Sequence, residues 1–71
     1  MPYVHVQITR EGDTSAERKA ELIAGMTRVL EQVLHKDPRS TFVVIEEVEL
    51  ENWGIGGLPV PEYRRRRAKE T

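Results

Sequence analysis

The residue with the most unusual chemical potential in this 71-residue chain is Pro2, directly after Met1. If Met1 is removed, the Pro2 nitrogen becomes a free secondary amine that can take up and release a proton. An α-amino group titrates near pH ~8 in an unfolded chain, and burial or neighbouring cations lower its pKa. An amine that titrates near neutrality is an effective general base. Pro2 is therefore a candidate for acid–base chemistry if Met1 is removed, although many proteins carry proline at this position merely because it suits methionine removal.

The remaining composition narrows the chemistry to this amine. The chain has no cysteine, and His5 and His35 are far apart without ligand spacing, so we expect neither a metal site nor a cofactor. The formal net charge is −1, from 11 basic and 12 acidic residues, which gives no reason to expect nucleic-acid or membrane binding. No signal peptide or membrane span is predicted, and a soluble cytoplasmic protein is the expectation.

Three elements must position Pro2. Residues Tyr3–Thr9 alternate as a strand should, with every second residue apolar. A helix is predicted from Ser15 to about Leu34, opened by a capping box between Thr14 and Glu17, with a wide apolar stripe. Residues 40–49 form a second predicted strand, and its continuous apolar run at 41–45 indicates burial on both faces.

These elements predict a single α/β (α+β) domain over residues 1–71, built on one βαβ unit with parallel strands. The glycine-rich segment 52–57 follows as a C-terminal hairpin. Its Trp53 is compatible with an interface and equally with the wall of a pocket. Residues 58–71 are predicted to be an extended basic tail, with its four consecutive arginines solvated. A two-stranded sheet in so short a chain buries little core, so we expect a homo-oligomer.

The start Met1-Pro2, the βαβ pattern and the segment 52–57 together resemble the 4-oxalocrotonate tautomerase family. The similarity covers about residues 2 to 57, and the segment reads Asn52-Trp53-Gly54-Ile55-Gly56-Gly57. The resemblance implies that Met1 is removed and that Pro2 moves a proton between oxygen and carbon of an enol or 2-oxo acid. It also implies that subunits pair into a four-stranded sheet per dimer, with hexamers built as trimers of dimers. Trp53 of a neighbouring subunit would then be the hydrophobic wall.

The family's substrate-binding arginines are not at their usual places. One should lie in the loop after the first strand, and the aligned place is near Asp13 or Thr14. Another should lie early in the second strand, where this chain has Phe42. We therefore expect Arg10 and Arg39 to bind the substrate carboxylate, and Phe42 and Trp53 to exclude water.

The leading hypothesis is an isomerase of the keto–enol class, an intramolecular oxidoreductase, with Pro2 as the catalytic residue and a small 2-oxo acid or enol as substrate. A second hypothesis is a hydrolytic dehalogenase acting on a haloacrylate, in which Pro2 is a charged acid. Glu47 is then the nearby strand acid that would activate water. A third hypothesis is a non-catalytic oligomeric interaction module.

Overall fold

Two strands joined by a long helix form the body of the molecule, in a computed structural model that describes residues 1–70. Strand β1 (Tyr3–Thr9) leads into helix α1 (Ala16–Leu34), and strand β2 (Phe42–Val48) returns beside β1. A short antiparallel pair, β3 (Gly54–Ile55) and β4 (Leu58–Pro59), precedes the last helix, α2 (Val60–Glu70). Single 3₁₀ turns occupy Pro38–Ser40 and Leu50–Asn52.

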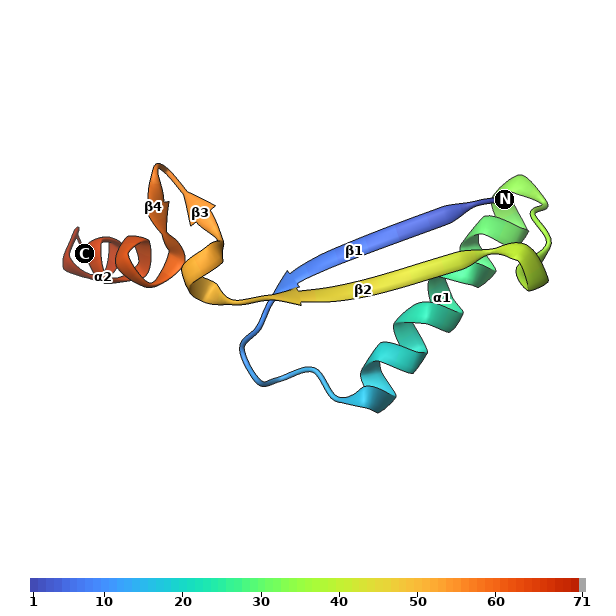
Figure 1. Cartoon of the computed structure of the whole chain (residues 1–71), viewed down its shortest axis with the longest axis horizontal. Coiled ribbons are helices and arrows are strands. Elements are labelled where there is room, and N and C mark those ends of the chain that lie inside the picture. The colour runs from blue at the N-terminus through green and yellow to red at the C-terminus, as the bar shows by residue number, and fades with distance from the viewer. Residues whose placement is uncertain (71) are drawn as a thin grey trace.

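The parallel pairing of β1 and β2 confirms the predicted βαβ unit (Figure 1). The register runs from Tyr3 opposite Phe42 to Thr9 opposite Val48. One further hydrogen bond extends the pairing at each end. The Phe42 N–H donates to the Pro2 carbonyl at 3.0 Å, and the Arg10 N–H donates to the Val48 carbonyl at 2.8 Å. The backbone at Pro2 is thereby fixed to the amino end of the sheet.

In the part of the chain that the structure describes, only one face of this sheet is covered. The side chains facing α1 are partly buried, and they come from both strands: Val4, Val6, Ile8, Val43 and Ile45. On the opposite face Tyr3, Phe42 and Val44 remain 62%, 51% and 44% exposed. The predicted burial of the second strand on both faces is therefore wrong for a single chain, because β2 has α1 on one side and no element on the other.

Helix α1 begins one residue later than the predicted capping box places it. Ser15 is the N-cap, and its hydroxyl accepts a hydrogen bond from the Arg18 N–H at 3.1 Å. The Thr14 hydroxyl instead donates to the Asp13 carboxylate at 3.3 Å. The helix ends at His35, whose left-handed backbone (φ 58°) turns the chain before it reaches Pro38. The capping box from Thr14 to Glu17 is therefore wrong.

The C-terminal hairpin is confirmed, but the extended tail is wrong. Gly56 and Gly57 form the turn between β3 and β4 with φ of 61° and 82°, a conformation that favours glycine. From Val60 the chain is helical, and Pro61 is accommodated because it lies in the first turn, where a missing N–H leaves no bond unmade. Thr71, the end of the predicted tail, lies outside the described residues.

The hairpin and α2 form a unit that projects beyond the carboxyl ends of the two long strands (Figure 1). The molecule is consequently elongated, with principal extents of 48 × 23 × 21 Å. Among the described residues Val60 alone is almost fully buried, at 6% exposure, and it lies at the start of α2. The interior of a single copy is therefore small and is split between the α1–sheet contact and this C-terminal unit.

Replacing the observed cap tests the start of α1. Ser15→Ala should lower the free energy of unfolding by about 1 kcal/mol, because the first-turn N–H of Arg18 loses its acceptor. Thr14→Ala is the matched control and should lower the free energy of unfolding by less than half as much. Urea unfolding at a fixed protein concentration measures both. If Thr14→Ala lowered the free energy of unfolding more than Ser15→Ala, the predicted capping box from Thr14 would be supported instead.

Candidate functional site

The parallel strands divide the predicted site residues between two ends of the sheet. Pro2, Arg39 and Phe42 lie at the amino ends of β1 and β2, whereas Arg10 and Trp53 follow their carboxyl ends. A seven-residue strand spans roughly 20 Å. Pro2 and Trp53 of one chain are therefore too far apart to contact the same small molecule.

The amino end of the sheet carries Pro2, and the arginine predicted for this end is already paired. Pro2 is partly buried, and Met1 before it is 89% exposed. The Arg39 side chain, 90% exposed, donates from Nε and Nη2 to the two carboxylate oxygens of Asp37, each at 3.2 Å. These hydrogen bonds, with one from the Arg39 backbone N–H, hold the pKa of Asp37 below its usual value. Arg39 thus lies three residues before Phe42, which bonds the Pro2 carbonyl, and its guanidinium is turned toward Asp37.

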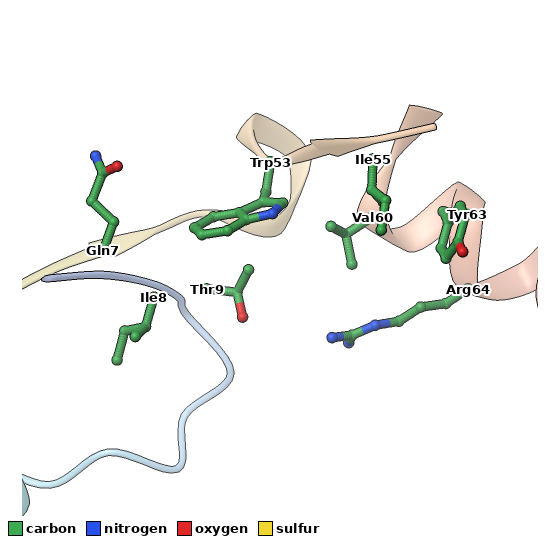
Figure 2. A pocket seen from close by; sticks show the side chains of 8 residues that line it. All are labelled: Gln7, Ile8, Thr9, Trp53, Ile55, Val60, Tyr63 and Arg64. Atoms are coloured by element: carbon green, nitrogen blue, oxygen red, sulfur yellow. The ribbon is translucent and has the colours of Figure 1, made fainter. Parts of the chain in front are cut away.

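The carboxyl end contains an open cavity of about 460 Å³ (Figure 2). The end of β1 forms one side and the C-terminal unit the other, so the cavity lies at the junction of the two parts. Its lining is mainly apolar and aromatic, with a single charged side chain: Gln7, Ile8, Thr9, Trp53, Ile55, Val60, Tyr63 and Arg64.

Local structure explains how α2 reaches this cavity. The Val60 N–H donates to the Trp53 carbonyl at 2.9 Å, which ties the first turn of α2 to the tryptophan. Helical spacing then brings Tyr63 and Arg64, three and four residues after Val60, onto the same side of α2. The Tyr63 ring packs on the hairpin turn, since a Cβ at Gly56 would lie 3.6 Å from it.

Arg64 is held in place by an acidic residue from the loop after β1. Its Nη1 and Nη2 donate to the two Glu11 carboxylate oxygens at 2.9 and 3.2 Å. The Thr9 hydroxyl donates to the same carboxylate at 2.5 Å. The Arg64 hydrogen bond first, and then that of Thr9, lowers the pKa of Glu11, and Glu11 in turn raises the pKa of Arg64. This pair fastens α2 to the sheet end across the cavity.

Sequence reasoning missed the contribution of α2 to the site. It treated the four arginines as a solvated tail, whereas Arg64 lines the cavity, and Arg65 and Arg66 contact Glu62. The available signal was the spacing of Val60, Tyr63 and Arg64 by three and four residues. Such spacing indicates one face of a helix, but the neighbouring prolines obscured it.

Two other predicted residues lie outside the cavity. The Arg10 Nε is 2.7 Å from Glu49 Oε1, and Arg10 does not line the cavity. Glu47 lies on the sheet face that α1 covers, with its side chain 10% exposed and paired with Lys19. The Lys19 hydrogen bond lowers the pKa of Glu47. Glu47 is therefore engaged in holding α1 to β2, which removes the support for its role as a water-activating base.

Within residues 1–70 no group of three potential acidic, histidine or cysteine ligands is placed to hold a metal ion. Neither α1 nor α2, as far as the structure describes them, is long and apolar enough to cross a membrane. The described residues thus offer Pro2 at one end of the sheet and an apolar cavity with one arginine at the other.

Comparison with known proteins places this arrangement in context. A family model described as "Tautomerase enzyme" matches residues 2–63. The chain is 52% identical over 65 residues to a protein named probable tautomerase K2 from Dickeya dadantii, covering 92% of this chain and 96% of that protein. It resembles the crystal structure of DmpI from Helicobacter pylori with a TM-score of 0.80 and 32% identity, covering 90% and 97% of the two chains. The crystal structure of TomN, a 4-oxalocrotonate tautomerase homologue in the tomaymycin biosynthetic pathway, matches with a TM-score of 0.80 and 30% identity. The match covers 99% of this chain and 100% of the TomN chain.

The pairing of Arg64 with Glu11 should make the cavity sensitive to acid. Since the pKa of Glu11 is lowered in the folded chain, the pair contributes stability above the ordinary carboxyl value of 4.5 and loses it as the pH falls through the lowered pKa. Trp53 is the chain's one tryptophan and lines the same cavity, so its fluorescence should change in that acidic range.

Glu11→Gln should remove this fluorescence transition, whereas Glu31→Gln, on the exposed side of α1, should leave it in place. A titration from pH 7 to pH 3 with circular dichroism recorded in parallel separates the local change from unfolding. An unaltered transition in Glu11→Gln would show that the ion pair does not control the cavity.

Proposed function

Because the chain belongs to the tautomerase family, we propose that it is an isomerase that interconverts the enol and keto forms of a 2-oxo acid, with Pro2 as general base and acid. One observation carries this proposal. Parallel strands hold Pro2 at one end of the sheet and the aromatic cavity at the other, and an antiparallel pair of subunits would bring the two together.

The proposed reaction needs one group that accepts and then returns a proton. The Pro2 nitrogen, freed by removal of Met1, takes the proton of the enol hydroxyl. The electrons of the O–H bond form the C=O bond, and those of the C=C bond move to the carbon next to it. The protonated Pro2 then delivers the proton to that carbon, which completes the ketone. The proton returns to the same molecule, so substrate and product are isomers. Apolar surroundings favour the neutral amine that starts this cycle.

Assembly is proposed to complete each site. Neither edge of the two-stranded sheet is paired by another strand among residues 1–70. An isologous twofold contact at one edge would run neighbouring strands antiparallel. The amino end of one β1 would then lie beside the carboxyl end of the other. This puts Pro2 of one subunit against Trp53 of the next and gives a four-stranded sheet per dimer. Further exposed apolar side chains on α1 suit burial in a homo-oligomer, including a hexamer: Ile23, Val29, Val33 and Leu34.

The remaining predicted residues receive supporting roles in this proposal. Arg39 lies at the amino end of the sheet, and Arg10 follows the carboxyl end of β1, which in the antiparallel dimer would lie beside Pro2 of the other subunit. Both would then supply positive charge to the developing enolate oxygen. Phe42 is paired with Tyr3 at the start of the sheet, where it would shield Pro2 from water. Trp53 is the apolar wall from the neighbouring subunit.

The role of Pro2 is tested with phenylenolpyruvate, whose ketonisation is followed by its loss of ultraviolet absorbance. Intact mass first establishes that Met1 is absent. The processed protein should accelerate ketonisation, and Pro2→Ala should lower kcat by roughly 10²–10⁴-fold, the usual contribution of a general acid–base group. A form that retains Met1 should be equally inactive, because the Pro2 nitrogen is then an amide. Full activity in either form would refute the proposal.

Mixing two impaired variants tests whether Trp53 acts across the subunit contact. Trp53→Ala alone should lower kcat/KM by roughly tenfold, equivalent to about 1.4 kcal/mol of lost apolar contact. When Trp53→Ala and Pro2→Ala chains are unfolded together and refolded, mixed dimers should regain one intact site, with Pro2 from one chain and Trp53 from the other. Activity no higher than the sum of the separate variants would place both groups in one chain.

A further inference from the structure

We propose that Arg64 grips the substrate carboxylate and that the site selects planar, apolar monocarboxylates such as aryl 2-oxo acids over dicarboxylates. The inference deepens the proposed function and rests on it for the identity of the reaction. It concerns a residue to which the family resemblance gives no role, on a helix that the sequence did not predict.

The placement of Arg64 is the first argument. It is the one charged side chain among the eight that line the cavity, and it lies with Trp53 and Tyr63 around the same space (Figure 2). Arg10 and Arg39 do not line that space. A carboxylate bound at Arg64 would place its attached chain against the indole of Trp53, within an otherwise uncharged lining.

The donors of Arg64 provide the second argument. A guanidinium has five N–H donors, and the Glu11 pair uses one on Nη1 and one on Nη2. Among residues 1–70 no acceptor is recorded for Nε. The edge formed by Nε and the neighbouring terminal nitrogen is therefore open to a bidentate carboxylate contact, while Glu11 still fixes the adjacent edge between Nη1 and Nη2.

Glu11 acts here as a positioning residue. Its carboxylate is itself held by the Thr9 hydroxyl at the end of β1, so Arg64 is anchored to the rigid sheet and its rotamers are restricted. An anchored guanidinium loses less side-chain freedom on binding than a free one. Glu11 also balances the charge of Arg64, which disfavours a second carboxylate at the site because no further cation lines the cavity.

The selectivity follows from the composition of the cavity. Ile8, Ile55 and Val60 offer apolar contact, and Trp53 and Tyr63 offer ring faces for an aromatic group. A dicarboxylate would have to desolvate its second charge against this lining without a partner, which is costly. An aryl monocarboxylate fits both the single arginine and the apolar walls.

Ligand binding is measured by quenching of Trp53 fluorescence, a readout independent of catalysis. In the wild type 3-phenylpropionate should bind at least tenfold more tightly than its neutral isostere 3-phenylpropionamide, and glutarate should bind more weakly than either. Arg64→Gln should abolish the preference for the acid and leave the affinity for 3-phenylpropionamide unchanged. Arg64→Lys should keep part of the preference for the acid. Arg65→Gln is the matched control, because Arg65 pairs with Glu62 on the same helix and does not line the cavity.

A second variant distinguishes carboxylate binding from simple loss of the ion pair. Glu11→Gln breaks the same pair but keeps the guanidinium, so the acid preference should persist in it. Equal loss in Glu11→Gln and Arg64→Gln would show that the pair only holds α2, and it would overturn the inference. Loss of the acid preference in Arg10→Gln or Arg39→Gln, with the preference kept in Arg64→Gln, would also overturn the inference. The same holds if neither ligand quenches Trp53 fluorescence in the wild type.

Turnover separates this inference from the proposed function. Arg64→Gln should raise KM for phenylenolpyruvate about tenfold with a smaller change in kcat. If Pro2→Ala abolishes turnover while Arg64→Gln changes neither KM nor acid preference, the tautomerase function stands and the inference about Arg64 is wrong. If Pro2→Ala has no effect while Arg64→Gln loses the acid preference, the carboxylate site stands and the proposed reaction is wrong.

Discussion

Parallel pairing of β1 with β2 is the constraint on which the rest of the structure depends. It requires a crossover connection, which α1 supplies, and it sets the amino ends of both strands together and both carboxyl ends together. Pro2 is consequently hydrogen-bonded into one end through its carbonyl, and every residue that follows β2 begins at the other. The length of the strands sets the distance between Pro2 and the cavity, so a single chain cannot bring the two together. This is why the proposed site needs two subunits.

Much of this frame was predictable because it rests on local patterns. The alternation in residues 3–9 gave the limits of β1 correctly, and the long periodic segment gave α1 to within one residue at its start. Paired hydroxyl residues before that helix offered two possible caps, and sequence alone does not decide between Thr14 and Ser15. Burial on both faces of β2 was inferred from composition, but what covers the second face of a sheet is a tertiary property that one chain does not supply.

Helix α2 was not predictable from its apolar pattern, because it has almost none. Its stability comes from contacts that periodicity does not reveal. Val60 is buried against the preceding hairpin, Glu62 pairs with two arginines one turn later, and Glu11 binds Arg64 from 53 residues away in sequence. Pro61 indicated extended structure, although the first turn of a helix tolerates proline equally well. The cavity escaped prediction for the same reason, since three of its eight lining residues lie on α2.

The departure from the family's arginine pattern acquires a physical explanation under the proposed role of Arg64. An arginine on a strand is positioned by the sheet, whereas one on α2 would swing with the helix unless it were tied down. The Glu11 carboxylate, itself fixed by Thr9 at the strand end, provides that tie across the cavity. A bound carboxylate would then meet a guanidinium whose direction is already set, in a site whose other walls are apolar. Placing the anion-binding group on the same segment as Trp53 also means that one subunit would orient the substrate while the other moves its proton.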